Sequence, residues 1–132
     1  MSVIDASVVA HLILGLPLAD AASGAFEATE DKAAPDLVNA EVLQVIRAHE
    51  RRGLVTSDRS SAARQALLDL PITRYPTLAL VGRAWELRHN FTAYDAMYVA
   101  LAEAVGTRLV TTDERLAAAA RAHTTIEVAL LT

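Results

Sequence analysis

The chain contains no cysteine, and this absence removes several kinds of chemistry. Disulfide bonds, catalytic thiolates and zinc sites built from thiolates are all excluded. Long apolar segments are also missing. The longest candidate for a membrane span starts at Ser7 and is interrupted by His11, Pro17 and Asp20, so it falls short of the ~18 uncharged residues that a span needs. The N-terminus carries Asp5 where a secretory signal would have basic residues. We therefore expect a cytoplasmic protein without membrane contact.

Lysine is nearly absent as well. Only Lys32 occurs among the 12 basic residues, so the positive charge is almost entirely guanidinium. Arginine is the better phosphate binder, because its planar fork donates two parallel hydrogen bonds. Arginines gather within one stretch, at positions 47, 51, 52, 59 and 64. A GC-rich genome would produce the same bias without any role in binding. The net charge of −4 argues against coating of nucleic acid by bulk electrostatics, but it does not exclude an enzyme that acts on nucleic acid.

Hydrophobic residues make up 53% of the 132 residues, a high share for a chain of this length. A sheet covered by helices on both faces would account for it, and so would an apolar groove for a partner. The predicted strands span residues 2–5, 32–35, 72–75, 108–111 and 125–130. The predicted helices span residues 6–14, 17–30, 37–52, 57–70, 77–89, 92–105 and 113–123. This alternation predicts one α/β domain over residues 1–132, with a mostly parallel central sheet covered by helices. Trp85 and Leu87 are expected in its core.

Four acidic residues lie beside these predicted elements: Asp5, Glu41, Asp95 and Asp113. Asp5 ends the first predicted strand and Asp113 follows the fourth, so both are expected beyond the carboxyl edge of the sheet, where such folds bind ligands. Glu41 and Asp95 lie on predicted helices rich in apolar residues. Carboxylates that converge without a basic partner are tolerated mainly when a cation binds them. The pattern therefore indicates a divalent metal site.

Each acidic residue also has a purely structural interpretation. Asp5 and Asp113 could cap the helices that follow them. Asp95 stands at the third position of its predicted helix, where a capping box places an acid. Glu41 could form an ion pair with Arg52. These interpretations stay open for each residue alone, but they do not account for the occurrence of four.

Four segments around these acids resemble the motifs of PIN-domain ribonucleases, and more narrowly those of the VapC toxins of bacterial toxin–antitoxin pairs. They read Val3-Ile4-Asp5-Ala6-Ser7, Asn39-Ala40-Glu41-Val42, Thr92-Ala93-Tyr94-Asp95-Ala96 and Leu109-Val110-Thr111-Thr112-Asp113. The segments occur in the family's order and span essentially the whole chain. The resemblance implies a PIN-like three-layer sandwich, with the sheet inside a shell of helices.

The resemblance also implies a chemistry and partners. It implies hydrolysis of RNA phosphodiester bonds with Mg²⁺ or Mn²⁺ as the cofactor. The expected catalytic and metal-binding residues are Asp5, Glu41, Asp95 and Asp113, supported by Ser7 and Thr112. Three arginines are expected to contact the RNA backbone, unless they simply form a solvated helix face: Arg47, Arg51 and Arg52. Relatives bind a small VapB-like antitoxin and commonly form homodimers, so we expect both kinds of partner.

Two other functions fit part of the pattern. An aspartate-based phosphatase also places an Asp after its first strand. Such a site normally has a second acid two residues later, where this chain has Ser7, and a later lysine that Lys32 does not match. A non-catalytic PIN-like binding module would keep the fold without turnover. Metal-dependent RNA cleavage that requires Asp5 would distinguish the ribonuclease from both alternatives.

Overall fold

The computed structural model describes residues 1–132, and its centre is a sheet of five parallel strands in the order β3-β2-β1-β4-β5. The strands are β1 (Ser2–Ile4), β2 (Lys32–Pro35), β3 (Thr73–Tyr75), β4 (Arg108–Thr111) and β5 (Val128–Leu130). In the register of the sheet, Val3 lies opposite Ala33 of β2 and Leu109 of β4. The chain begins in the middle of the sheet, extends to one edge and returns past β1. The junction of β1 and β4 is therefore a switch point, where parallel sheets bind ligands beyond their carboxyl ends.

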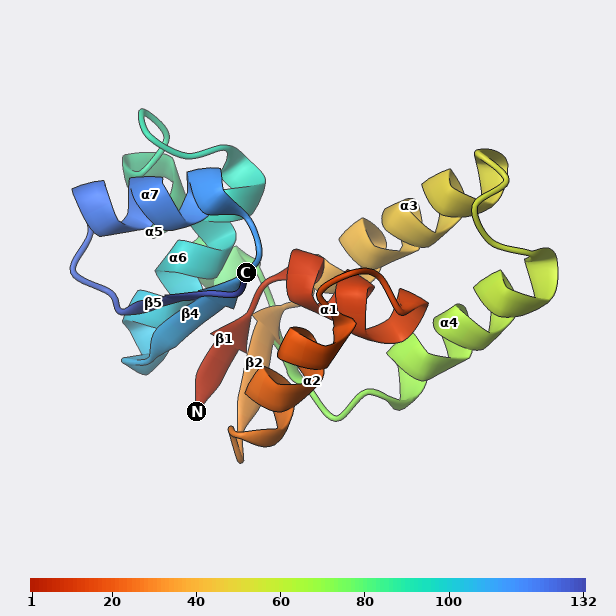
Figure 1. Cartoon of the computed structure of the whole chain (residues 1–132). Helices are drawn as coiled ribbons and strands as arrows, with labels where there is room; N and C mark the ends of the chain where they lie inside the picture. The colour runs from red at the N-terminus through yellow and green to blue at the C-terminus, as the bar shows by residue number, and fades with distance from the viewer.

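Helices cover both faces of this sheet. They are α1 (Ala6–Leu14), α2 (Ala19–Glu27), α3 (Val38–Arg51), α4 (Ser57–Asp69), the 3₁₀ turn η1 (Leu78–Leu80), α5 (Val81–Glu86), α6 (Ala93–Val105) and α7 (Glu114–His123). Figure 1 shows α1 to α4 on one side of the sheet and α5 to α7 on the other. Right-handed crossovers place helices in this way when a chain winds outward and then returns. The expected three-layer sandwich is confirmed, and its sheet is entirely parallel.

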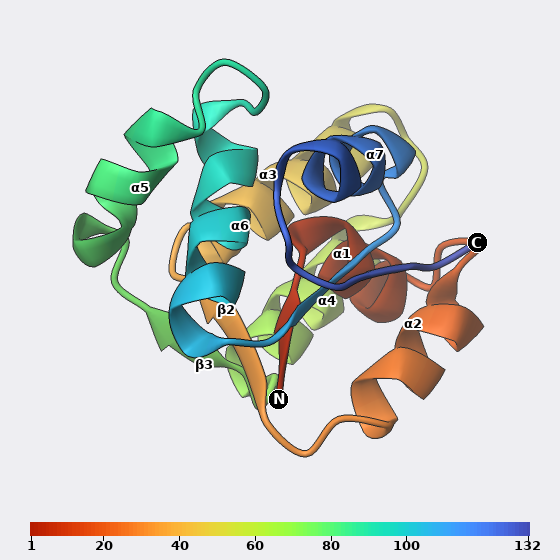
Figure 2. The same ribbon diagram turned by 90° about the vertical axis from the view of Figure 1, so that its left-hand side faces the viewer.

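The core lies where the central strands meet α1 and α6. Val3, Ile4, Leu109 and Val110 have no exposed surface, as expected for strands covered on both faces. On one face α6 packs across β1, β2 and β4 (Figure 2). Tyr98 of α6 is also fully buried. The covered sheet thus accounts for much of the hydrophobic composition, and it holds the carboxyl ends of β1 and β4 in a rigid setting.

The prediction of a helix over residues 77–89 is wrong in the length of the helix and in placing one of its residues in the core. The segment begins as η1, continues as the short α5 and ends in turns whose N–H groups reach carbonyls three residues back. Leu87 is buried, as predicted, but Trp85 is 66% exposed. The Trp85 ring stacks under the Arg88 guanidinium, with 4.5 Å between the guanidinium carbon and the ring centroid. A single helical turn has one inward face, and the buried Ala84 and Leu87 occupy it.

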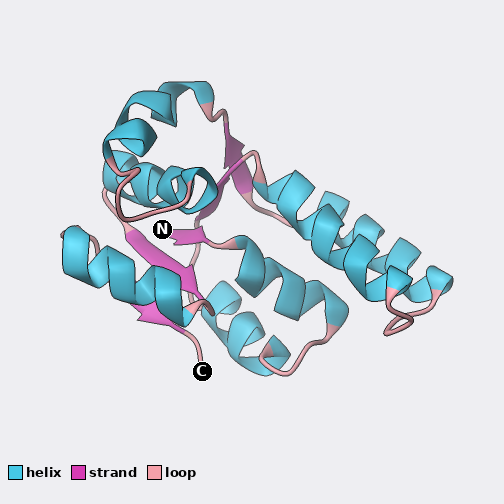
Figure 3. Cartoon of the chain, turned by 90° about the horizontal axis from the view of Figure 1, so that it is seen from above, coloured by secondary structure: helices cyan, strands magenta, loops and turns pink.

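Helices α3 and α4 pack side by side as a hairpin that projects from the sheet (Figure 3). Two arginines tie the hairpin to the rest of the chain, Arg59 from the start of α4 and Arg74 from β3. The Arg59 guanidinium donates to the carbonyl of Ile13 at 2.6 Å, and the Arg74 guanidinium donates to Asn39 Oδ1 and to the carbonyl of Leu67, both at 2.7 Å. Arg59, one of the clustered arginines, therefore has a structural partner within the chain.

No single helix is long and apolar enough to cross a membrane. The pair α1 and α2 meets the length and composition threshold only when taken together, and the two helices are bent by 114° relative to each other.

Candidate active site

All four acidic residues singled out from the sequence line one cavity of about 510 Å³. Each follows a different strand of the sheet. Asp5 comes directly after β1 and Asp113 two residues after β4, while Glu41 lies in the first turn of α3, after β2, and Asp95 in the first turn of α6, after β3. Because parallel strands end at one edge, the topology brings together residues that are far apart in sequence. Ser7, at the start of α1, lines the same cavity.

Asp5 is the most deeply placed of the four, with 6% of its surface exposed. Its Oδ2 accepts hydrogen bonds from Ser7 Oγ at 2.6 Å and from Thr111 Oγ1 at 2.7 Å. Thr111 Oγ1 in turn accepts from the backbone N–H of Asp113 at 3.0 Å, and Ser7 Oγ accepts from the N–H of Thr112 at 3.1 Å. This closed network ties the end of β1 to the end of β4 and fixes the orientation of Asp5.

The structural interpretations of the acids have different outcomes. Asp5 occupies the N-cap position of α1, but its side chain makes no capping hydrogen bond there. Asp113 does cap α7, because its Oδ1 accepts from the N–H groups of Arg115 and Leu116 at 2.9 and 3.2 Å. For Asp95, the capping group is Thr92, whose Oγ1 accepts from the Asp95 N–H at 3.1 Å. A capping role for Asp113 leaves its other carboxylate oxygen available to the cavity.

Glu41 makes no ion pair with Arg52. Instead Oε1 of Glu41 accepts a 2.7 Å hydrogen bond from the hydroxyl of Tyr98 on α6. The partner was missed because it lies 57 residues away, although its position three residues after Asp95 places it on the same helix face. Burial raises the pKa of Tyr98, and the nearby charge of Glu41 raises it further. The phenol is therefore a neutral donor to the Glu41 carboxylate.

The acids repel one another in the absence of a cation. Burial is the main cause of the raised pKa of Asp5, and the charge of Asp113 adds to it. Burial raises the pKa of Glu41, with added repulsion from Asp5 and Asp95. Burial and the charges of Asp5 and Asp113 raise the pKa of Asp95 to about 6. Carboxylates with this behaviour favour either a proton or a bound cation.

The donor set fits a hard divalent cation in its chemistry. The cavity offers carboxylate and hydroxyl oxygens, which Mg²⁺ and Mn²⁺ prefer, and neither cysteine nor histidine lines it. No group of three His, Asp or Glu side chains is arranged to hold one ion in the conformation of this structure. Mg²⁺ is typically bound by one or two carboxylates, with water and substrate phosphate as further ligands. Asp5 and Asp95, with Asp113 and Glu41 nearby, match that mode of binding.

Thr111 was missed by the interpretation of the sequence, which assigned the supporting role to its neighbour Thr112. Thr111 is fully buried and contacts both Asp5 and Asp113 through its hydroxyl, whereas Thr112 reaches the network through its backbone N–H. The alternation of side chains between the two faces of a strand could have identified Thr111. Residues two apart face the same side, so Thr111 and Asp113 share a side that Thr112 does not.

We expect Thr111→Val to lower the free energy of unfolding by about 1–3 kcal/mol, because it removes a hydrogen bond from the buried Asp5 carboxylate and leaves the Asp113 N–H without its acceptor. Thr112→Val is the matched control and should change that free energy by less than about 0.5 kcal/mol. Urea unfolding of the metal-free proteins measures both. Equal losses in the two variants would contradict the assignment of the network to Thr111.

Fold and site together define an α/β protein with an acidic cavity at the switch point of a parallel sheet. The PIN domain family model matches residues 2–122, and the chain belongs to the PIN-domain family. It is 38% identical over 128 residues to a VapC ribonuclease of Mycobacterium bovis, an alignment that covers 97% of this chain and 98% of that protein. The resemblance inferred from the four sequence segments is thereby confirmed.

Two solved structures resemble the fold. PAE2754 from Pyrobaculum aerophilum has a TM-score of 0.69 and 23% identity, over 96% of this chain and 81% of that one. VapC20 of Mycobacterium tuberculosis, described as a toxin that cleaves the sarcin-ricin loop, has a TM-score of 0.69 and 20% identity, over 90% of this chain and 95% of that one. Similarity at these identities supports the three-layer architecture.

Proposed function

We propose that this protein is a VapC-type ribonuclease toxin that hydrolyses RNA phosphodiester bonds with Mg²⁺ or Mn²⁺. The observation that carries the proposal is the convergence of the four family acids, Asp5, Glu41, Asp95 and Asp113, on one cavity at the switch point of the sheet. The identity of 38% with a VapC ribonuclease over nearly the whole chain supports the same activity. The family match over residues 2–122 supports a single PIN-like domain for residues 1–132.

In this proposal the acids bind the cation and the hydroxyls hold the acids. When bound, the cation lowers the pKa of a water and neutralises charge that develops on the phosphate. Asp5 and Asp95 are the primary ligands, and Glu41 and Asp113 act through water or accept a proton. Ser7 and Thr111 keep the Asp5 carboxylate oriented by donating to one of its oxygens. Both hydroxyl groups are uncharged, so the negative charge of Asp5 remains available to the cation.

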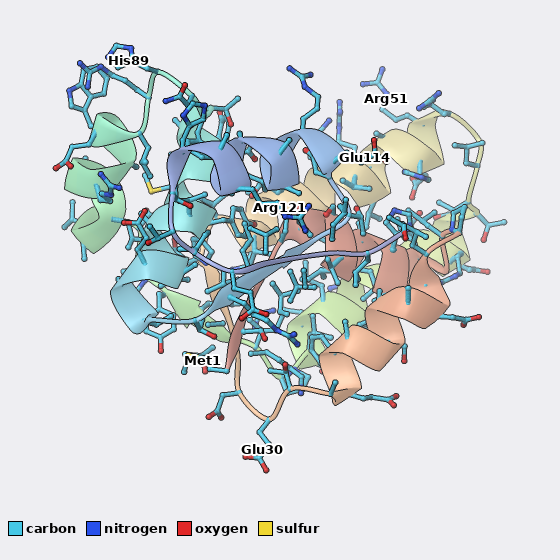
Figure 4. All side chains as sticks on the ribbon, turned by 60° about the vertical axis from the view of Figure 1, so that its left-hand side comes forward. Met1, Glu30, Arg51, His89, Glu114 and Arg121 are labelled. Carbon is cyan, nitrogen blue, oxygen red and sulfur yellow. The ribbon has the colours of Figure 1, made fainter.

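We assign contact with the RNA backbone to the outer part of the α3–α4 hairpin. Arg47 and Arg51 of α3 line a cavity of about 520 Å³ together with Arg64 of α4. Arg52 follows α3 and is exposed, but it does not line this cavity. Figure 4 shows Arg51 near the outer end of α3, away from the sheet. Glu50 also lines the cavity and offsets part of its charge.

The arginine assignment predicts a change in the salt dependence of RNA binding. In an Asp5→Asn background, which prevents cleavage, Arg47→Gln with Arg51→Gln should reduce the slope of log affinity against log salt by about 1.4, or about 0.7 for each single-strand phosphate contact. Fluorescence anisotropy with labelled single-stranded RNA measures the slope. Arg88→Gln, on the opposite side of the sheet, is the control and should leave the slope unchanged. An unchanged slope in the double variant would identify this face as merely solvated.

We also propose a small VapB-like antitoxin and a second copy of the chain as partners, with the cytoplasm as the place of action. Apolar side chains remain exposed on two surfaces and support the expectation of protein partners. One surface is on η1 and α5, with Leu78, Val81 and Trp85, and the other is on the hairpin, with Leu43 and Leu68.

The test of the proposed function is cleavage of a pool of cellular RNAs by the purified protein. Discrete cuts with Mn²⁺ or Mg²⁺, abolished by EDTA, are the expected result. Absence of cuts while Mn²⁺ still raises the melting temperature would favour the PIN-like binding module. Hydrolysis of small phosphoesters without any effect on RNA would favour the aspartate-based phosphatase.

A further inference from the structure

One fully buried polar side chain contacts the acidic cavity without lining it. Tyr98 lies on α6, one turn after Asp95, and has no exposed surface. Its hydroxyl donates to Oε1 of Glu41, on α3, at 2.7 Å. A buried tyrosine hydroxyl needs a hydrogen-bond partner. Here the partner is an acid of the candidate site.

Glu41 depends on this contact for its orientation. The carboxylate of Glu41 has no salt-bridge partner, since the ion pairs of the chain join Arg83 to Glu86 and to Glu103. The Tyr98 hydroxyl is the only hydrogen-bond donor to the Glu41 side chain, so Oε2 of Glu41 is left without a hydrogen bond. A glutamate side chain has several rotatable bonds, and one short hydrogen bond from a rigid buried ring removes much of that freedom. The bond holds one oxygen while Glu41 lines the cavity.

The chemical type of the donor matters as much as its position. An arginine or lysine in the same place would hold Glu41 but would also neutralise it. A phenol holds the carboxylate and leaves its negative charge intact. Asp5 has the same type of partner, because its side-chain donors Ser7 and Thr111 are also uncharged hydroxyls. Neutral groups behind a metal ligand commonly set its orientation, and replacing them weakens metal binding or activity by about 10–100-fold.

We propose that Tyr98 is a positioning residue that fixes Glu41 for its interaction with the divalent cation or with a water on that cation. This inference rests on the proposed metal-dependent function, because it assigns to Glu41 a role toward the cation. Tyr98 itself does not touch the substrate. Its effect passes entirely through the Glu41 carboxylate.

The test compares Mn²⁺ binding in two tyrosine variants without RNA present. Tyr98→Phe keeps the buried ring and removes only the hydroxyl, so Mn²⁺ affinity should fall by about tenfold. The electron paramagnetic resonance signal of free Mn²⁺ measures the affinity directly. Tyr75→Phe makes the same chemical change on β3, at the edge of the sheet, and should leave Mn²⁺ affinity unchanged. RNA cleavage by Tyr98→Phe should require a correspondingly higher Mn²⁺ concentration and recover when Mn²⁺ is saturating.

A double variant tests whether the effect passes through Glu41. In a Glu41→Gln background, Tyr98→Phe should cause no further loss of Mn²⁺ affinity. If Tyr98→Phe fails to fold, Glu41→Asp provides the second test, because a side chain shorter by one methylene keeps the charge but no longer reaches the phenol. It should show a similar loss of Mn²⁺ affinity, about tenfold.

The outcomes separate this inference from the proposed function. Unchanged Mn²⁺ affinity in Tyr98→Phe, with normal binding by the wild-type protein, would overturn the role of Tyr98 alone. Absence of Mn²⁺ binding by the wild-type protein would overturn both. An additional loss from Tyr98→Phe in the Glu41→Gln background would show that the tyrosine acts on the whole core, which also contradicts the inference.

Discussion

Replacing Asp5 by asparagine should reduce metal-dependent RNA cleavage by about 10³-fold, because a metal contributes several kcal/mol of charge stabilisation and each ~1.4 kcal/mol is a factor of ten in rate. Asp5 is the most buried of the four acids that line the cavity, and its carboxylate is fixed by two hydroxyl donors. The asparagine carbonyl oxygen can still accept the hydroxyl bonds from Ser7 and Thr111 that reach Oδ2 in the native protein. The fold should therefore survive while the charge is lost.

Initial cleavage rates at a fixed Mn²⁺ concentration measure this effect, and circular dichroism checks the fold. Asp20→Asn is the matched control, because it removes an exposed carboxylate on α2 outside the cavity. Its cleavage rate should equal that of the native protein. A folded Asp5→Asn variant that cleaves RNA at the native rate would refute the assignment of the chemistry to this cavity.

Replacing Asp95 by asparagine should have opposite effects on the metal-free and metal-bound proteins. The metal-free protein should become more stable by about 1–2 kcal/mol: the shift of the Asp95 pKa to about 6 corresponds to roughly twice that energy before solvent screening is considered. The metal-bound protein should lose up to about 4 kcal/mol of cation-induced stabilisation at Mn²⁺ concentrations of about 1,000 times Kd. Thermal melts with EDTA and with Mn²⁺ measure both effects.

The gain in metal-free stability should depend on pH. The folded-state pKa of Asp95, about 6, lies above its ordinary value of 3.8, so folding favours the protonated form. The stabilising contribution of that form is complete below pH 3.8 and is lost as the pH rises through 6. The difference between Asp95→Asn and the native protein should therefore be absent at pH 3.5 and complete above pH 6.5.

The control is Asp58→Asn. Asp58 is an exposed acid in the first turn of α4, and α4, like the helix of Asp95, is capped by a threonine. It should be slightly destabilising, by about 0.3–1 kcal/mol, because it removes only a favourable interaction with the helix dipole. If Asp95→Asn destabilised the metal-free protein in the same way, Asp95 would be a helix-cap residue and not a member of a repelling cluster.

The sequence predicted the sheet well because β1 and β4 are short segments rich in apolar residues, each followed by an acid and then a helix. It also predicted the gathering of the four acids, because parallel strands end at one edge, and Asp5 and Asp113 come one and two residues after the ends of β1 and β4. The helix at residues 77–89 was predicted less well. Its apolar residues suggested one continuous helix with Trp85 inside, yet the packing buries only Leu80, Ala84 and Leu87.

The partners of the acids were harder to predict than the acids themselves. Thr111 and Thr112 are adjacent and chemically identical, and only the side of the strand decides which hydroxyl faces Asp5. Tyr98 resembles an ordinary core residue of an apolar helix, and its contact with Glu41 depends on how α3 and α6 meet across the end of the sheet. Such contacts arise from tertiary packing, which local periodicity does not encode.

The position of β1 has a consequence for synthesis of the protein. The Asp5 carboxylate is bound by the Thr111 hydroxyl, 106 residues later in the chain, and β1 pairs with β4 over the same span. Contacts of such long sequence separation require the closure of a long loop and make folding slow. Because chains grow at about 5–20 residues per second, a nascent chain carries Asp5 for several seconds before its partner strand exists. The acidic site is therefore assembled only near the completion of translation, and a chain interrupted just before β4 carries three of the four acids but not the site.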